Sequence, residues 1–173
     1  MSDWLRTVGD TIQEEFSDLP DAAALTRMTV RLTMAAALGG VLGFERERSG
    51  KAAGLRTHML VALGAALFVL IPQQAGMSGG DLSRVLQGLV AGVGFLGAGA
   101  ILKGDAEEEV KGLTTAAGLW MTAAIGVAAG LGRESTAAIS TGLALAVLTA
   151  VPKVARYFER DPVKPVGRPK PKR

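Results

Sequence analysis

Eight polar side chains at the ends of long apolar stretches are the residues of this chain whose types could do chemistry. The inner cluster consists of Glu45, Arg46, Arg56, Thr57 and His58. The outer cluster consists of Arg31, Asp81 and Arg84. Because arginine outnumbers carboxylate in both clusters, the inner cluster suits an anion, a lipid headgroup or an acidic partner. A role in setting the orientation of the chain in a membrane explains the inner cluster equally well.

Arg31 is the single residue with the strongest functional signal, because it lies about ten residues into an apolar stretch. An arginine at that depth costs several kcal/mol unless it is paired or reaches the interface. Asp81 is the only acidic residue between Glu47 and Asp105, which makes it the best local partner. The alternative is that Arg31 extends its guanidinium to the membrane surface.

Metal-ion and enzyme chemistry find little support in these residues. The chain has no cysteine and a single histidine, so a zinc site would depend on carboxylates. Glu45 and Asp81 fall at opposite ends of the predicted bundle and cannot supply the hard oxygen ligands of one magnesium ion. The histidine has no paired base or metal partner. We therefore expect no metal site, no cofactor and no enzymatic activity.

The elements that must position the two clusters are apolar stretches long enough to cross a bilayer. No ionisable side chain occurs over the 21 residues from Gly112 to Gly132, which as a helix would rise about 30 Å, the thickness of the hydrocarbon core. The sequence predicts an all-α, polytopic transmembrane helical bundle of about five spans. The spans are residues 22–44, residues 55–74, and the stretches between Arg84 and Lys103, between Lys111 and Arg133, and between Glu134 and Lys153. The short connection at 131–134 predicts that the last two form an antiparallel hairpin.

The composition divides the chain into three regions. Residues 1–21 form an amphipathic segment, either a helix that covers the bundle or a helix in the membrane interface. Residues 22–152 form the transmembrane domain. Residues 153–173, rich in proline and basic residues, are predicted to be a disordered cytoplasmic tail attracted to anionic lipid. We expect no nucleic-acid partner.

Small residues recur at helical spacing within the spans, at Gly39 and Gly43, at Gly88 and Gly92, and at Gly126 and Gly130. In lipid, helices associate through close backbone approach, which small residues permit. These rows predict tight packing and are compatible with a homodimer. The segment GVGFLG at 92–97 fits the dinucleotide pattern, but it lies inside an apolar span, so we reject that interpretation. A local break of the helix there is a minor alternative.

The basic residues predict the orientation of the spans. The connections at 45–57 and 103–112, together with the tail, hold 14 of the 19 lysines and arginines. Connections rich in lysine and arginine stay in the cytosol. The N-terminus is therefore expected outside and the C-terminus in the cytosol, with the inner cluster on the cytosolic side.

Three stretches resemble the MgtC/SapB family of bacterial inner-membrane proteins, and the resemblance covers about residues 27–150. They are LGFERERSGKAAGLRTHMLV (42–61), DLSRVLQGLVAGVGFLGAGAIL (81–102) and VKGLTTAAGLWMTAAIGVAAGLG (110–132). The family signatures fall on Arg31, Glu45, Arg46, Arg56, Thr57, His58, Asp81, Arg84, Thr114, Thr115 and Trp120. The family has no established catalytic residues, so these positions are candidates for binding.

The resemblance implies a multi-pass inner-membrane protein linked to adaptation to low magnesium and to bacterial survival inside host cells. Some members act by binding and restraining the membrane ATP synthase. Regulation by binding a membrane complex is therefore the implied function, and a magnesium-related transporter or channel is the alternative. Many members carry a soluble C-terminal domain, whereas a basic tail follows Val151 here.

Overall fold

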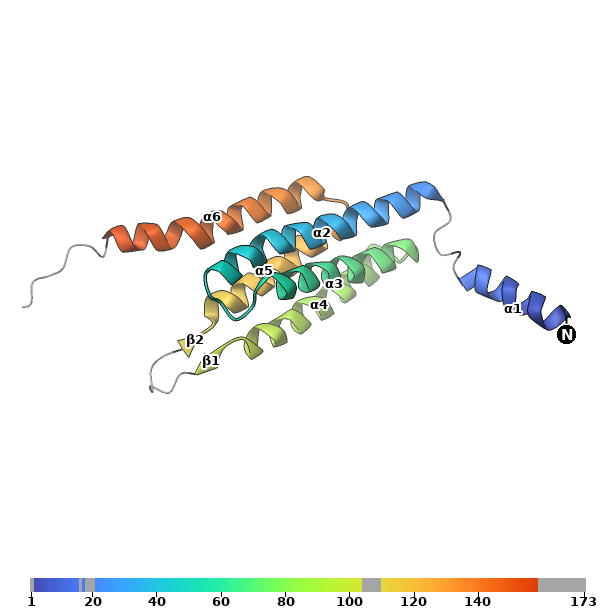
Figure 1. Cartoon of the computed structure of the whole chain (residues 1–173), viewed down its shortest axis with the longest axis horizontal. Helices are drawn as coiled ribbons and strands as arrows, with labels where there is room; N and C mark the ends of the chain where they lie inside the picture. Colours follow the sequence, from blue (N-terminus) through green and yellow to red (C-terminus); the bar gives the residue numbers. More distant parts are fainter. Residues whose placement is uncertain (1, 16, 18–20, 104–109, 159–173) are drawn as a thin grey trace, which may run out of the picture.

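The computed structural model describes residues 2–15, 17, 21–103 and 110–158, and it confirms the all-α fold class (Figure 1). The helices are α1 (Ser2–Glu15), α2 (Ala22–Arg48), α3 (Leu55–Gln74), α4 (Gly79–Gly99), α5 (Leu113–Gly130) and α6 (Glu134–Phe158). Two short strands, β1 (Leu102–Lys103) and β2 (Val110–Lys111), pair antiparallel between α4 and α5. Helix α1 lies apart from the bundle in Figure 1.

Four helices are long and apolar enough to cross a membrane, judged by length and composition. They are α3, α4, α5 and the segment Glu134–Ala155 of α6. Helix α2 has 27 residues and packs along α3, but it carries Arg27 and Arg31 in its first half and a run of charges at its end. A fifth span through α2 therefore stays a prediction.

The predicted ends of a span agree with the observed ends of the helix where the apolar residues and the helix stop at the same position. Helix α3 covers the predicted residues 55–74, with Pro72 in its last turn. Helices α5 and α6 are joined by residues 131–133 and run side by side, as predicted for the hairpin (Figure 1). At the turn, Gly132 has a φ of 73°, a left-handed conformation that glycine adopts without steric cost.

Elsewhere the helices extend beyond the predicted spans. Helix α2 continues past residue 44 to Arg48, because the charged segment at its end is made of good helix formers. Helix α4 begins at Gly79, since the side chain of Ser78 accepts a hydrogen bond from the Asp81 amide and caps it. It then runs without a break through GVGFLG. Helix α6 continues to Phe158, past the predicted domain boundary at 152. Residues 159–173 of the predicted tail lie outside the described residues.

Helix α3 is held between α2 and α5 by glycines. We call Gly39, Gly43, Gly126 and Gly130 the glycine seam. A Cβ atom at Gly39 would lie 2.7 Å from the His58 carbonyl oxygen, and one at Gly130 would lie 2.6 Å from the Ala66 carbonyl oxygen. The helix backbones therefore touch, as expected for helices that associate in lipid through close approach.

The other predicted small-residue row has a different environment. Within the described part of the chain, a Cβ atom added at Gly88 or Gly92 would meet nothing within 4 Å. Helix α4 contacts α5 through Gly97, where a Cβ would lie 3.5 Å from the Ala116 methyl group. The row formed by Gly88 and Gly92 thus lies on the outer surface of the bundle.

Candidate functional site

The end of helix α2 carries a buried arginine whose hydrogen-bonding capacity is largely unused. Arg46 is only 3% exposed. Its Nη1 lies 3.5 Å from Glu45 Oε2, whereas Nε and Nη2 have no hydrogen-bond partner among the described residues. A buried guanidinium is costly unless it is paired and hydrogen-bonded. This end of the bundle is therefore a candidate site for a further negatively charged or polar group.

Glu45 compensates Arg46 only in part. Its Oε1 accepts a hydrogen bond of 2.7 Å from the hydroxyl of Ser49, one helical turn further along. Its Oε2 faces Arg46 but makes no hydrogen bond within the described structure. One carboxylate thus serves a guanidinium that still has free N–H donors.

His58 lies in the first turn of α3 and is 1% exposed. Its Nδ1 donates a hydrogen bond of 3.0 Å to the carbonyl oxygen of Gly54. The other ring nitrogen, Nε2, points towards α5, where a Cβ at Gly118 would lie 3.6 Å away. No described group bonds to Nε2. In the neutral ring with its proton on Nδ1, Nε2 is an acceptor that lacks a donor.

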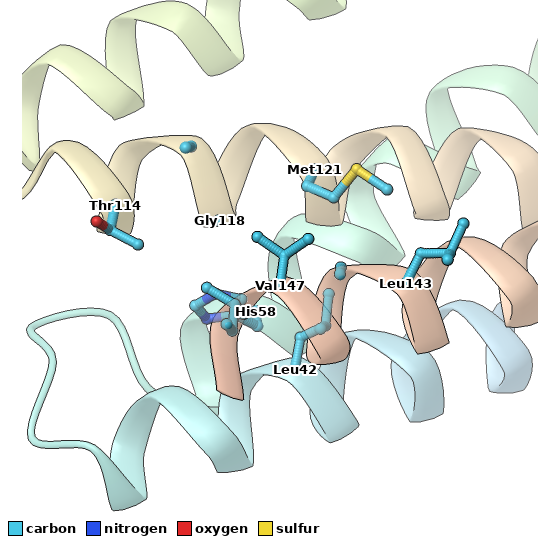
Figure 2. Close-up of a pocket in the computed structure, with 10 residues that line it drawn as sticks. Leu42, His58, Thr114, Gly118, Met121, Leu143 and Val147 are labelled. Carbon is cyan, nitrogen blue, oxygen red and sulfur yellow. The ribbon is translucent and has the colours of Figure 1, made fainter. Parts of the chain in front are cut away.

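The His58 side chain borders an apolar cavity of about 330 Å³, which we call the His58 cavity (Figure 2). Its walls come from α2, α3, α5 and α6 and include Leu42, Thr114, Ala117, Gly118, Met121, Leu143, Val147 and Leu148. Figure 2 shows His58 close to Leu42 and Val147, with Thr114 and Gly118 on the facing helix. An apolar cavity with one or two polar groups has the usual composition of a small-molecule site.

A larger cavity of about 1110 Å³, the basic cavity, adjoins the His58 cavity, and the two share Thr114, Val147 and Leu148. Its ionisable lining residues are Glu45, Arg46, Arg48, Lys51 and Lys153. Four cations thus surround a single carboxylate at the end of α2 and α6. The two cavities together are apolar at one end and cationic at the other.

The structure divides the predicted inner cluster. Glu45, Arg46 and His58 are brought together, whereas Arg56 and Thr57 are exposed and line another, polar cavity of about 450 Å³, which shares Lys51 with the basic cavity. In that cavity Glu47 accepts a hydrogen bond of 2.8 Å from the Leu55 amide and so caps α3. Arg56 and Thr57 therefore do not contribute to the His58 cavity.

The outer cluster also differs from the prediction, because Arg31 does not pair with Asp81. The Nη1 of Arg31 donates hydrogen bonds of 3.1 Å to Gln73 Oε1 and to the Gly130 carbonyl oxygen. Asp81 instead accepts a hydrogen bond of 2.7 Å from Ser78 at the start of α4. Gly130 ends α5, where free carbonyl groups favour a cation. Two features of the sequence could have predicted these partners of Arg31. Gln73 lies at the end of the neighbouring span, and the carbonyl groups at the end of a helix favour a cation.

The remaining candidate residues fall in three environments. Arg84 is exposed on α4. Thr115 is buried in the first turn of α5, while Thr114 is exposed where the two cavities meet. Trp120 is 51% exposed and lines none of the cavities described above. Of these four residues, only Thr114 therefore lies at the candidate site.

Comparison with known proteins gives a consistent result. A sequence model of the MgtC family matches residues 32–157. Protein SrpB of Synechococcus elongatus is 44% identical over 143 residues, which are 75% of this chain and 77% of SrpB. Protein MgtC of Brucella abortus (strain 2308) is 48% identical over 124 residues, covering 70% of this chain and 50% of that protein.

YhiD of Escherichia coli (strain K12), named as a proposed magnesium transporter, is 41% identical over 126 residues, 69% of this chain and 58% of YhiD. The chain therefore spans little more than half the length of YhiD and half of the Brucella protein, but most of SrpB. No solved structure matches the chain significantly.

Proposed function

This chain belongs to the MgtC family, and from that premise we propose that it is a membrane protein that supports adaptation to low magnesium by binding and regulating another membrane complex. Two relatives, MgtC and the proposed magnesium transporter YhiD, supply the link to magnesium. Resemblance to family members that restrain the ATP synthase makes that complex the first candidate partner. Four apolar helices provide the membrane anchor.

The exposed glycine row of α4 is the observation that carries the regulatory proposal. A Cβ atom added at Gly88 or Gly92 would meet no described atom of another helix within 4 Å, and together with Phe68 and Leu96 these glycines line an apolar groove of about 460 Å³. Lipid tails gain little from such a groove over any other apolar surface. A second helix gains close backbone contact there. A transmembrane helix of the partner complex therefore fits this face of α4.

Co-purification in mild detergent tests this function. We expect the double variant Gly88→Leu/Gly92→Leu to lose the partner, because two leucines fill the groove that a neighbouring helix would enter. The same variant should fail to restore growth of a deletion strain in low magnesium. Ala91→Leu is the matched control, since Ala91 is exposed on α4 but does not line the groove. Recovery of the wild-type chain with only copies of itself would contradict the proposal in favour of a homodimer.

Transport of magnesium or another solute is the alternative, and it rests on polar cavities at both ends of the bundle. A cavity of about 180 Å³ lies beside Arg31 and Gln73, and the basic cavity lies at the opposite end. The glycine seam closes the space between them, so transport would require α2 or α5 to separate from α3. Flux of magnesium in proteoliposomes that disappears with Arg31→Ala would favour transport. No flux for any candidate solute would reject it.

We further propose that the chain lies in the bacterial cytoplasmic membrane with the basic cavity facing the cytosol. The support is the concentration of Arg46, Arg48 and Lys51 at one end of the bundle. Because the chain has no native cysteine, Ser49→Cys and Met77→Cys can report the two ends separately. An impermeant thiol reagent applied to whole cells should label Met77→Cys alone. Labelling of Ser49→Cys alone would reverse the topology.

A further inference from the structure

We propose that the His58 cavity and the basic cavity form one binding site for an anionic glycerophospholipid, with one acyl chain in the former and the phosphate at Arg46 in the latter. The site lies between α2, α3, α5 and α6, and none of its lining residues lines the α4 groove. The lipid site is therefore independent of the regulatory contact proposed above, and the failure of one proposal would not disprove the other.

The shape of the combined cavity favours an amphiphile over a compact solute. The two cavities share Thr114, Val147 and Leu148, so a ligand can pass from one to the other. In the His58 cavity, Met121 and the exposed Leu143 offer apolar contact to an acyl chain. The mouth adds four basic side chains and one carboxylate. A ligand that is apolar at one end and anionic at the other matches both halves.

The unused donors of Arg46 identify the anionic group as a phosphate or a group of the same geometry. Nε and Nη2 are neighbouring atoms of the planar guanidinium, and neither has a described hydrogen-bond partner. Both atoms are buried, and Arg46 lines the basic cavity, so its guanidinium has to turn towards that cavity when the ligand enters. Two oxygens of one anion then accept hydrogen bonds from both N–H groups, the arrangement by which arginine binds phosphate. Such a bond would compensate the buried charge that Glu45 leaves partly unpaired.

The position of His58 indicates which part of the lipid it contacts, namely the glycerol backbone between the phosphate and the acyl chain. His58 borders the apolar cavity beside Gly118, one helical turn along α5 from Thr114 of the shared wall, and its Nε2 is an acceptor without a donor among the described residues. A free hydroxyl on the glycerol backbone would supply that donor. A monoacyl phospholipid has this hydroxyl, and a diacyl phospholipid does not. The site should therefore prefer the monoacyl form of an anionic lipid.

Lipid binding by the full-length chain in dodecyl maltoside, followed by native mass spectrometry, tests the site. We expect dioleoyl phosphatidylglycerol to bind at least tenfold more tightly than dioleoyl phosphatidylcholine. The double variant Arg48→Gln/Lys153→Gln should weaken phosphatidylglycerol binding about 30-fold and leave phosphatidylcholine unchanged. It avoids the buried Arg46, whose replacement endangers folding. Equal affinity for the two lipids in the wild-type chain would overturn the proposal.

The apolar half of the site is tested by a matched pair on α5. Ala117 is exposed and lines the His58 cavity, whereas Ala124, two turns further along the same helix, is exposed and lines none of the described cavities. Ala117→Leu should weaken binding of phosphatidylglycerol at least tenfold, and Ala124→Leu should not. An equal loss in both variants would show that the chain does not occupy this cavity.

Two further comparisons separate the sources of the phosphate and test His58. An excess of free glycerol 3-phosphate should fail to displace the bound lipid, and displacement would show a soluble-phosphate site instead. Monooleoyl phosphatidylglycerol should bind more tightly than the dioleoyl form, and His58→Phe should remove that difference. A preference for the dioleoyl form, or one that survives His58→Phe, would refute the placement of the glycerol hydroxyl.

Discussion

The glycine seam and the glycine row of α4 have the same residue type and the same spacing but opposite surroundings. Gly126 and Gly130 of α5 lie against the backbone of α3, so that a Cβ at Gly130 would lie 2.6 Å from a carbonyl oxygen. Gly88 and Gly92 of α4 face open space within the described structure. In a bilayer both rows favour helix contact, but only the seam makes that contact within one chain. The row on α4 is thus available to something outside the chain.

The largest stability effect should come from Gly126→Ala. A Cβ there would overlap the Ala62 carbonyl group, and its neighbouring backbone atoms, at 2.9 Å, cannot rotate away. We expect the free energy of unfolding to fall by about 3 kcal/mol or more, the upper range for an overfilled core. Unfolding in detergent, followed by circular dichroism, measures it. Gly142→Ala, which adds a methyl group in open space on α6, is the control.

For Gly39→Ala, on the other side of α3, we expect the free energy of unfolding to fall by about 2 kcal/mol. Here the new methyl group would meet the His58 carbonyl oxygen at 2.7 Å and the Ala62 Cβ at 2.8 Å. Because one of these contacts is a side chain, Ala62→Gly should restore part of the stability lost in Gly39→Ala. The same second change should not rescue Gly126→Ala, whose clash is with backbone. Equal rescue of both would disprove the assigned contacts.

The smallest effect is expected for Gly88→Ala/Gly92→Ala. These methyl groups enter empty space, so the free energy of unfolding should change by less than about 0.5 kcal/mol, or rise slightly because alanine favours helix over glycine. The same unfolding measurement checks it. If this variant destabilises the isolated chain as much as Gly39→Ala does, the row on α4 is part of the fold, and its contrast with the seam disappears.

Sequence reasoning predicted the fold best where helix and apolar run share their ends. Residues 55–74 were predicted as a span and form α3. The start of α4 and the end of α6 were displaced. Ser78 caps α4 ahead of its most apolar part, and α6 continues past Lys153 to Phe158. Hydropathy records how much of a helix suits lipid, and it does not mark where the helix stops.

The candidate site was predicted less completely, because spacing along one helix does not show which way a side chain faces across the bundle. Arg46 and Arg56 were placed in one cluster, yet Arg46 is buried and Arg56 is exposed. The partner of Arg31 was sought among carboxylates, whereas an amide side chain and a helix-end carbonyl bind it. Periodicity likewise could not distinguish the glycine seam from the row on α4.

Ala62 has contacts on both sides, with its Cβ next to Gly39 and its backbone next to Gly126. Sliding α2 or α5 along α3 by even part of a turn would drive a bulkier residue into that contact. The contacts among α2, α3 and α5 therefore leave little room for sliding. We expect a change of shape to move α4 or α6 against these three helices first, on the two faces where the partner helix and the lipid are proposed to bind.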